Sequence, residues 1–416
     1  MNRKILIVKR NLNKSTLVRV VFSVMCLIMN FDGKNYRQLP TADNSPMNNK
    51  FEKNNPFSRR DFLKLSSLGV GALALQPLRS DKPLAEFPEG ELLGRNCTGG
   101  IALVRTRPDV NSTLVKQGYE DTVFPWLREV SATNNDYNVN IQRWVETPDG
   151  YVYAPTLQPV RNQLNEVLQY IPDGNAGFWA EITIPFVDVY LENPPARSPG
   201  LRYLIEKGLP TRLYYSQVMW IDQIKTGNSG KIIYHINEGE KHGYGYGDVF
   251  WAEGSAFRPL VEEEVSPISP NTDPADKIIK INLTYQTLSC YEKDREVYFC
   301  RVSTGGGNFA TPTGEFVTWR KAITIHMAAG TVDAGYDTPG VSWTNFFVGT
   351  GVAIHATFWH NEFGQKRSHG CVNCRPEDAK WIFRWTTPQV TLIESDVNWN
   401  DWEKGSTKVI VEERLF

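Results

Sequence analysis

Apolar residues along this chain fall in short alternating runs rather than in long helical stretches. From residue 91 onward these runs are rich in Val, Ile, Tyr, Phe and Trp, and Gly, Pro, Asn and Asp separate them. This is the pattern of short β-strands joined by turns, so we predict a mainly β protein. One segment differs, because Pro376–Trp385 starts with proline and two acidic residues. Proline suits the first position of a helix and acidic residues suit its first turn, so we expect a short helix there.

Residues 91–165 carry the pattern of a small β-barrel, with about five short strands in succession. Asp149–Gly150 lies between two alternating runs, which predicts a tight hairpin. The stretch that ends this unit, Trp144–Val160, resembles the end of a bacterial SH3-like module. We therefore expect an SH3-like β-module here, called the first β-module below.

Residues 175–267 show a similar pattern and predict a second β-module, which we also compare with SH3-like modules. Its closing segment Arg258–Leu260 echoes Gln158–Val160 of the first, which indicates two related modules in tandem. We expect their many aromatic residues to fill the barrel cores rather than to form a glycan-binding or peptide-binding surface. A proline-rich segment, residues 261–276, links the second β-module to the rest of the chain.

The N-terminal part contains few fold signals. Residues 1–57 predict a disordered or mis-started extension, because much of this segment is rich in Asn, Lys and Pro. Within residues 58–90, Arg59 and Arg60 precede the apolar stretch Leu65–Leu75. This arrangement resembles a twin-arginine export signal, and we expect it to direct the protein to the cell envelope, either the periplasm or the cell wall. An uncleaved signal would act as a membrane anchor.

The composition narrows the choice of partners. The chain has 416 residues, of which 41% are apolar, and its formal net charge is −1. This charge gives no electrostatic reason to bind nucleic acid. Its six cysteines are too sparse for a disulfide-stabilised scaffold.

The strongest chemical signal is His355 followed by the cysteine motif, Ser368–Asn373, which reads S-H-G-C-V-N. A thiol with a pKa near ~8.5 is mostly protonated at neutral pH, so a cysteine nucleophile needs a base or a field that favours the thiolate. A histidine can take the proton, and the helix expected from Pro376 places its positive end just downstream. Gly370 permits a tight turn that can aim N–H groups at an oxyanion. A lone cysteine is more often a small buried hydrophobe, but that interpretation leaves the neighbouring His369 unexplained.

This motif resembles that of the L,D-transpeptidase catalytic domain family (YkuD-type) of bacterial cell-wall enzymes. The resemblance covers residues 277–396, called the catalytic unit, and implies a β-sandwich there with the short helix after the cysteine; residues 397–416 are expected to be a C-terminal tail. It implies that Cys371 is the nucleophile and that His355 is the base, with its other ring nitrogen held by the Ala356 carbonyl. The histidine before Gly-Cys, His369, lines the site, and the implied substrate-binding residues are Ser368, Gly370, Asn373, Trp359 and Tyr336.

The resemblance also implies a reaction without cofactor or metal. Cys371 attacks a tetrapeptide stem of peptidoglycan, D-alanine leaves, and the acyl group passes to an amine of a neighbouring stem. Carbapenem-type β-lactams are expected to acylate the same cysteine. Two alternatives stay open: water as acceptor would give a carboxypeptidase or endopeptidase, and a catalytically silent chain would be a cell-wall-binding protein. The intact set of His355, His369 and Cys371 favours an enzyme.

Cys374 departs from the family pattern, because an apolar residue is usual at this position. Cys371 and Cys374 form a C-x-x-C, which also occurs in redox and zinc sites. The β-rich context lacks the βαβ unit of redox proteins, and four ligands drawn from one tight turn and His355 would not converge on zinc without strain. A regulatory disulfide between the two thiols remains an open hypothesis.

Overall fold

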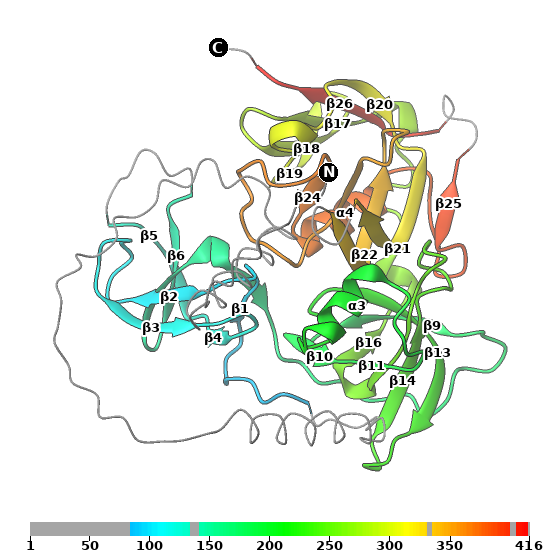
Figure 1. Cartoon of the computed structure of the whole chain (residues 1–416). Helices are drawn as coiled ribbons and strands as arrows, with labels where there is room; N and C mark the ends of the chain where they lie inside the picture. The colour runs from blue at the N-terminus through cyan, green and yellow to red at the C-terminus, as the bar shows by residue number, and fades with distance from the viewer. Residues whose placement is uncertain (1–83, 134–140, 331–334, 400–404, 415–416) are drawn as a thin grey trace, which may run out of the picture.

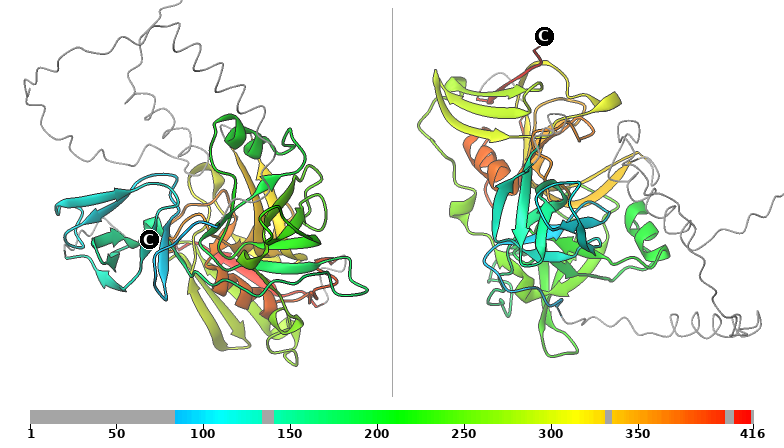
Figure 2. Two further views of the ribbon diagram at one scale, coloured as in Figure 1. Left: turned by 90° about the horizontal axis from the view of Figure 1, so that it is seen from below. Right: turned by 90° about the vertical axis from the view of Figure 1, so that its left-hand side faces the viewer.

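The computed structural model describes residues 84–133, 141–330, 335–399 and 405–414. The expected N-terminal extension and the twin-arginine segment through residue 83 lie outside this part. The described chain is mainly β, as predicted, with two α-helices, and it forms three bodies (Figure 1). The first β-module lies to one side of the other two, and Figure 2 shows the same arrangement from two further directions. Within the described residues, no helix is both long and apolar enough to cross a bilayer.

The first β-module consists of two antiparallel sheets. Its core includes Val104, Phe124, Val145, Val152 and Leu157, which are almost completely buried. The predicted hairpin at Asp149–Gly150 is present, since Thr147 pairs with Gly150. The sheets have the orders β4-β1-β8 and β3-β2-β7-β6-β5, from β1 (Leu93–Asn96), β2 (Ala102–Arg105), β3 (Leu114–Gly118), β4 (Val123–Pro125), β5 (Arg128–Ser131), β6 (Arg143–Thr147), β7 (Gly150–Tyr153) and β8 (Leu157–Val160).

The second β-module has a six-stranded sheet, a two-stranded sheet and helix α3 (Pro199–Glu206), which begins at Ser198 as N-cap. Its core is aliphatic and aromatic, as the sequence predicted, and includes Ile182, Met219, Tyr234 and Phe257. The orders are β11-β15-β14-β13-β9-β16 and β10-β12, from β9 (Phe178–Ile182), β10 (Phe186–Asp188), β11 (Tyr190–Leu191), β12 (Arg212–Tyr214), β13 (Val218–Thr226), β14 (Ile232–Asn237), β15 (Val249–Glu253) and β16 (Phe257–Pro259).

The two β-modules end in the same way, which gives the weak sequence repeat a structural basis. In the first, β7 runs into a 3-10 turn, η1 (Ala154–Thr156), and then into β8; in the second, β15 runs into η2 (Gly254–Ala256) and then into β16. The last strand then pairs antiparallel with the first strand of its module, β8 with β1 and β16 with β9. Their assignment as SH3-like remains a prediction.

The catalytic unit contains two five-stranded sheets that enclose a common core with helix α4 (Pro376–Trp385). Ile279, Val409, Ile354 and Ile382 from both sheets and the helix meet in that core. The helix has the bounds that the sequence predicted. The sheet orders are β19-β18-β17-β26-β20 and β24-β23-β22-β21-β25, from β17 (Lys277–Asn282), β18 (Thr287–Glu292), β19 (Arg295–Arg301), β20 (Gly314–Val317), β21 (Arg320–Ala329), β22 (Tyr336–Phe346), β23 (Ala353–Ala356), β24 (Val372–Cys374), β25 (Asp396–Asn398) and β26 (Lys408–Glu412).

The catalytic unit extends beyond residue 396, into the segment that the sequence analysis set apart as a tail. Strand β26 lies between β17 and β20, parallel to the first and antiparallel to the second. Val409 and Val411 of this strand are buried. Apolar and polar residues alternate in Lys408–Glu412, but the segment is short. Its pairing with β17 and β20 shows that it belongs to the core.

A charged histidine joins the second β-module to the catalytic unit. His326 of β21 lies between two carboxylates, with Nδ1 3.0 Å from Glu238 Oε1 and Nε2 2.5 Å from Asp337 Oδ1. Asp337 also accepts hydrogen bonds from Ser198 Oγ and Gly200 N, at the start of α3. Burial by itself lowers the pKa of His326, but its hydrogen bonds to Asp337 and Glu238 outweigh this effect and raise the pKa to about 9. The imidazolium therefore bridges the two bodies at neutral pH.

Candidate active site

Parallel pairing of β23 with β24 brings the predicted base and nucleophile to one face of a sheet. His355 pairs with Asn373, and Ile354 pairs with Val372. Side chains alternate along a strand, so His355 and Asn373 share a face, and Cys371, two residues before Asn373, projects to that same face. Cys371 and His355 are thus diagonal neighbours, although the loop between them is long.

The hydrogen bonds of His355 fix its tautomer. Its ring is buried, and Nδ1 lies 2.9 Å from the carbonyl oxygen of Ala356. A carbonyl oxygen only accepts, so Nδ1 carries the proton and Nε2 keeps a lone pair. This is the contact expected from the sequence, and it leaves His355 able to act as a base.

Cys371 and His355 do not form a preformed thiolate–imidazolium pair. Burial lowers the pKa of His355 to about 4 and raises the pKa of Cys371 to about 11. Both groups are therefore neutral at neutral pH. The sequence favoured a thiolate stabilised by the helix that starts at Pro376, but strand β24 separates Cys371 from that helix.

The turn before Cys371 is held by Ser368. Its hydroxyl accepts a hydrogen bond from Gly370 N (3.1 Å) and donates one to the Cys371 carbonyl. Gly370 has a φ of +115°, which L side chains rarely adopt. The hydrogen bonds of Ser368 therefore favour a role in shaping the turn, and its direct contact with substrate stays a prediction.

A glycine-rich segment, residues 304–311, braces this turn from the other side. Gly306 N donates to Ser368 O (3.1 Å), and Thr311 Oγ1 donates to Gly370 O (2.7 Å). A Cβ on Gly305 would lie 2.0 Å from the carbonyl oxygen of Phe309, so only glycine fits there. Residues 304–311 thus act as a fixed wall behind the cysteine motif.

Aromatic rings flank both histidines. The ring of His369 lies 4.8 Å from that of Phe309 and 5.5 Å from that of Tyr336, centroid to centroid. Trp359 lies 5.8 Å from His355. Tyr336 and Trp359 were predicted from the sequence, whereas Phe309 carried no signal that distinguished it from other loop aromatics. Phe309 is 44% exposed, so its ring is available to a bound peptide.

His360 is a second residue that the sequence analysis missed. Its Nδ1 accepts from Glu362 N (3.2 Å), and its Nε2 lies 2.8 Å from the side-chain amide of Asn373. Burial, and then the charge of Arg367, lowers the pKa of His360 to about 3, so the ring is neutral. Asn373 is therefore oriented by His360, beside His355.

The two thiols of the C-x-x-C face opposite sides of their sheet. Cys374 is buried in the main core with Cys290 and Cys300, whereas Cys371 packs against a separate cluster that includes Ala353. Residues three apart on a strand project to opposite faces, so neither a shared zinc ion nor a disulfide between Cys371 and Cys374 fits this geometry. Cys374 acts as a core residue.

The predicted site residues fall into three linked sets, and their chemical roles remain predictions. Ser368 bonds to Gly370 and Cys371, His355 pairs with Asn373 and lies beside Trp359, and His369 lies beside Tyr336.

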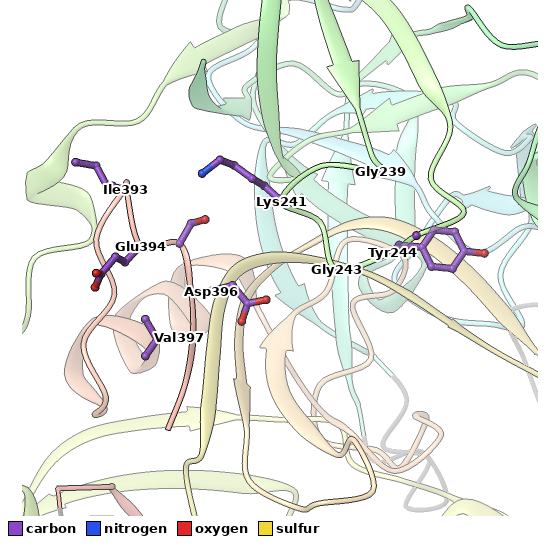
Figure 3. A pocket seen from close by; sticks show the side chains of 10 residues that line it. Gly239, Lys241, Gly243, Tyr244, Ile393, Glu394, Asp396 and Val397 are labelled. Atoms are coloured by element: carbon purple, nitrogen blue, oxygen red, sulfur yellow. The ribbon is translucent and has the colours of Figure 1, made fainter. Parts of the chain in front are cut away.

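An open cavity of about 770 Å³ lies elsewhere, between a loop of the second β-module and the segment around β25. Lys241 reaches across it toward Ile393 and Glu394, while Tyr244 points away (Figure 3). Asp396, also in its lining, is paired with Arg320. None of its lining residues belongs to the cysteine motif, and a base beside a nucleophile is not among them.

Comparison with known proteins shows what this chain resembles. No curated protein matches the chain. A solved L,D-transpeptidase of Enterococcus faecium, in a cysteine-to-serine mutant form, is 26% identical over 33% of this chain and 50% of its own, with a TM-score of 0.25. The catalytic domain of the E. faecium enzyme acylated by ertapenem is 26% identical over 33% of this chain and 97% of its own (TM-score 0.25). An L,D-transpeptidase in complex with imipenem is 16% identical over 60% of this chain and 99% of its own (TM-score 0.28).

This chain covers half of the length of the first of these structures. The family model described as the L,D-transpeptidase catalytic domain (YkuD) matches residues 276–411. That range includes both sheets of the catalytic unit, strand β26 almost to its end, and every predicted site residue. The part of the chain that carries the cysteine site, residues 276–411, thus matches the L,D-transpeptidase catalytic domain family.

Proposed function

We propose that this chain is a cysteine-dependent L,D-transpeptidase that cross-links peptidoglycan stems. The observation that supports the proposal is the β23–β24 pair. Cys371 lies two residues before Asn373, the strand partner of His355, whose neutral ring is held at Nδ1 by Ala356. A cell-wall-binding protein has no use for a thiol and a base arranged in this way. The match of residues 276–411 to the catalytic domain family supports the same reaction class.

In the acylation step, Cys371 Sγ attacks the carbonyl carbon at the L-centre of the diamino acid in a tetrapeptide stem. His355 Nε2 takes the thiol proton as the carbon–sulfur bond forms, so no free thiolate accumulates. The tetrahedral oxyanion then collapses, the bond to D-alanine breaks, and His355 returns the proton to the departing amine. A thioester to Cys371 remains.

In the transfer step, an amine of a neighbouring stem attacks the thioester carbonyl. His355 Nε2 takes a proton from that amine and delivers it to the departing sulfur, which restores the thiol. We infer that Trp359 and Tyr336, with Phe309, contact the stem, because their rings lie beside His355 and His369. If water replaces the amine, the same steps make the enzyme a carboxypeptidase or endopeptidase.

The test is mass spectrometry of purified muropeptides after incubation with the enzyme. Cross-linked dimers with loss of D-alanine support a transpeptidase, and loss of D-alanine without dimers supports the hydrolytic alternative. Cys371→Ala should abolish either product while it leaves the fold intact, because it removes the nucleophile and little packing. Cys374→Ala is the matched control, since it removes a buried thiol and should retain activity. Intact muropeptides after wild-type incubation would instead favour the wall-binding protein.

We also propose that carbapenems inhibit this enzyme by acylating Cys371. A β-lactam presents a strained carbonyl to the same sulfur, and opening of the ring retains all its atoms on the protein. The expected result is a mass increase equal to the whole inhibitor on the peptide that contains Cys371. An unmodified Cys371 after prolonged incubation with ertapenem would contradict this proposal.

We further propose export to the cell envelope through the Arg59-Arg60 signal. Lysine preserves charge but lacks the planar guanidinium, so a receptor that reads this geometry should reject the double substitution of both arginines to lysine. The assay is fractionation of cells that express either form, with activity in whole lysate as control. Undiminished export of the double-lysine form would point to an ordinary secretion signal or anchor.

A further inference from the structure

The first β-module reaches the loop beside the catalytic base through a buried arginine. Arg95 of β1 is 2% exposed, and each of its side-chain nitrogens donates a hydrogen bond. Nη2 donates to the carbonyl oxygen of Phe358 (2.8 Å), three residues after His355 and directly before Trp359. An arginine from one body thus holds the backbone of another body next to the active site.

Arg95 is itself held rigidly within the β-modules. Gln158 Oε1 accepts from Nε (3.0 Å) and from Nη2 (2.8 Å), and Asp121 Oδ1 accepts from Nη1 (2.7 Å). The guanidinium also stacks on the ring of Tyr214, 4.1 Å from its centroid. Asp121 is shared with Arg212 of the second β-module, at 2.7 Å. A planar guanidinium with several hydrogen bonds has a fixed orientation, so it holds its partners at defined angles. A lysine ammonium carries the same charge but does not fix these angles.

Two further contacts hold the same loop. Asn361, which is fully buried, donates from Nδ2 to the carbonyl oxygen of Ala154 in η1 (3.1 Å). Phe358 stacks on Tyr214 of the second β-module, with centroids 5.6 Å apart and planes 23° apart. The 357–361 loop is therefore clamped on both sides of Trp359, by Arg95 before it and by Ala154 after it. Both clamps come from the first β-module.

The equivalent pair in the second β-module provides a natural comparison. Arg95 pairs with Gln158 across β1 and β8, and Glu181 pairs with Arg258 across β9 and β16. Arg258 bonds to Glu181 and Glu264 but is one-third exposed, and Glu264 in turn bonds to Lys380 of α4. Arg258 thus reaches the catalytic unit only through Glu264, whereas Arg95 bonds directly to the loop beside His355.

We propose that Arg95 is a positioning residue for the transpeptidase site, and that the first β-module completes this site by fixing the 357–361 loop, which carries Trp359 beside His355. The expected loss of kcat/KM rests on the proposed function, whereas the expected loosening of the 357–361 loop does not. Arg95 touches no substrate; it acts through the Phe358 carbonyl and the direction of the Trp359 ring beside His355. A tandem of independent wall-binding modules would not need this buried connection.

The first experiment measures hydrogen–deuterium exchange of the 357–361 backbone in the full-length chain. Arg95→Met should accelerate exchange in this loop, and Arg95→Lys should do so less. Asn361→Ala removes the second clamp without leaving a buried charge unpaired, and it should give the same local effect if Arg95→Met does not fold. Arg258→Met is the matched control and should leave the loop unchanged. Unchanged exchange in Arg95→Lys and Asn361→Ala would overturn the proposal, whatever the reaction.

The second experiment distinguishes a misplaced Trp359 from general damage to the Cys371 site. In Arg95→Met and Asn361→Ala, kcat/KM for a tetrapeptide stem should fall about tenfold, a moderate effect for misplaced substrate contacts. Alkylation of Cys371 by iodoacetamide should stay within about twofold, because this small probe needs no Trp359 wall. Equal losses in both reactions, or none in either, would overturn the proposal. If the wild-type chain leaves the stem intact, only the proposed function is refuted. The hydrogen–deuterium exchange data would still show whether Arg95 and Asn361 hold the 357–361 loop.

Discussion

The neutral state of Cys371 and His355 leads to a specific expectation for the pH dependence of alkylation. Iodoacetamide reacts with the thiolate, and burial raises the pKa of Cys371 to about 11. The rate should therefore rise about tenfold for each pH unit from 6 up to roughly 10. A preformed thiolate–imidazolium pair would instead give a plateau across neutral pH.

The magnitude at pH 7 follows from two opposing effects. Relative to an ordinary cysteine with a pKa of about 8.5, a pKa of about 11 lowers the thiolate fraction by roughly 300-fold. The more basic thiolate is intrinsically more nucleophilic, by about tenfold for this difference. The population effect is larger, so native Cys371 should react about thirtyfold more slowly than the same cysteine in the unfolded chain.

The assay follows the mass of the peptide that contains Cys371 after timed alkylation at each pH. The same protein in concentrated urea gives the unfolded reference, and Cys371→Ser shows that the signal belongs to this thiol. Four other described cysteines, Cys97, Cys290, Cys300 and Cys374, are buried, and peptide mapping separates them from Cys371. A native rate that exceeds the urea rate at pH 7, or a plateau between pH 6 and 9, would refute the neutral pair.

Three further results are expected. His355→Ala should lower kcat/KM by about a hundredfold or more, yet leave alkylation at pH 10 nearly unchanged because alkylation needs no base; equal loss in both would show damage to the thiol site. Gly370→Ala should destabilise the chain by roughly 1–3 kcal/mol in urea unfolding, because its φ of +115° is strained for alanine. Finally, the pKa of His326, about 9, lies above the unfolded value of about 6.5, so its contribution is fully present below pH 6.5 and is lost as pH rises through 9. The free energy of unfolding should fall by up to roughly 3 kcal/mol between pH 6 and 10, and His326→Gln should flatten that part of the profile.

The parts of this site that sequence reasoning could predict are those encoded locally. The order Ser368–Asn373 and the spacing to His355 carry the chemistry, and Pro376 with its acidic neighbours sets the start of α4. The bond from His355 to Ala356, which the family resemblance implied, also joins adjacent residues. Each of these features depends on positions that are neighbours in the chain or belong to one motif.

The features that were missed depend on long-range pairing. The effect of burial on the pKa of Cys371 is set by residues from other strands, and no local pattern reports it. His360 lies in a polar loop, and only its contact with Asn373 makes it relevant. In the sequence, nothing distinguishes Arg95 from other charged residues near the start of a β-module. Its importance depends on the hydrogen bond to Phe358, which lies far along the chain.

The position of β26 has a consequence for how the catalytic unit can form during synthesis. Strand β17 begins this unit, but its parallel neighbour is made only from Lys408 onward, after the cysteine motif and α4. Until then β17 and β20 both have an unpaired edge, which is a hazard for association with other nascent chains. Folding that depends on such distant contacts is slow. A premature stop before residue 408 would retain every predicted site residue and yet leave a three-stranded sheet, β19-β18-β17, with β20 unpaired.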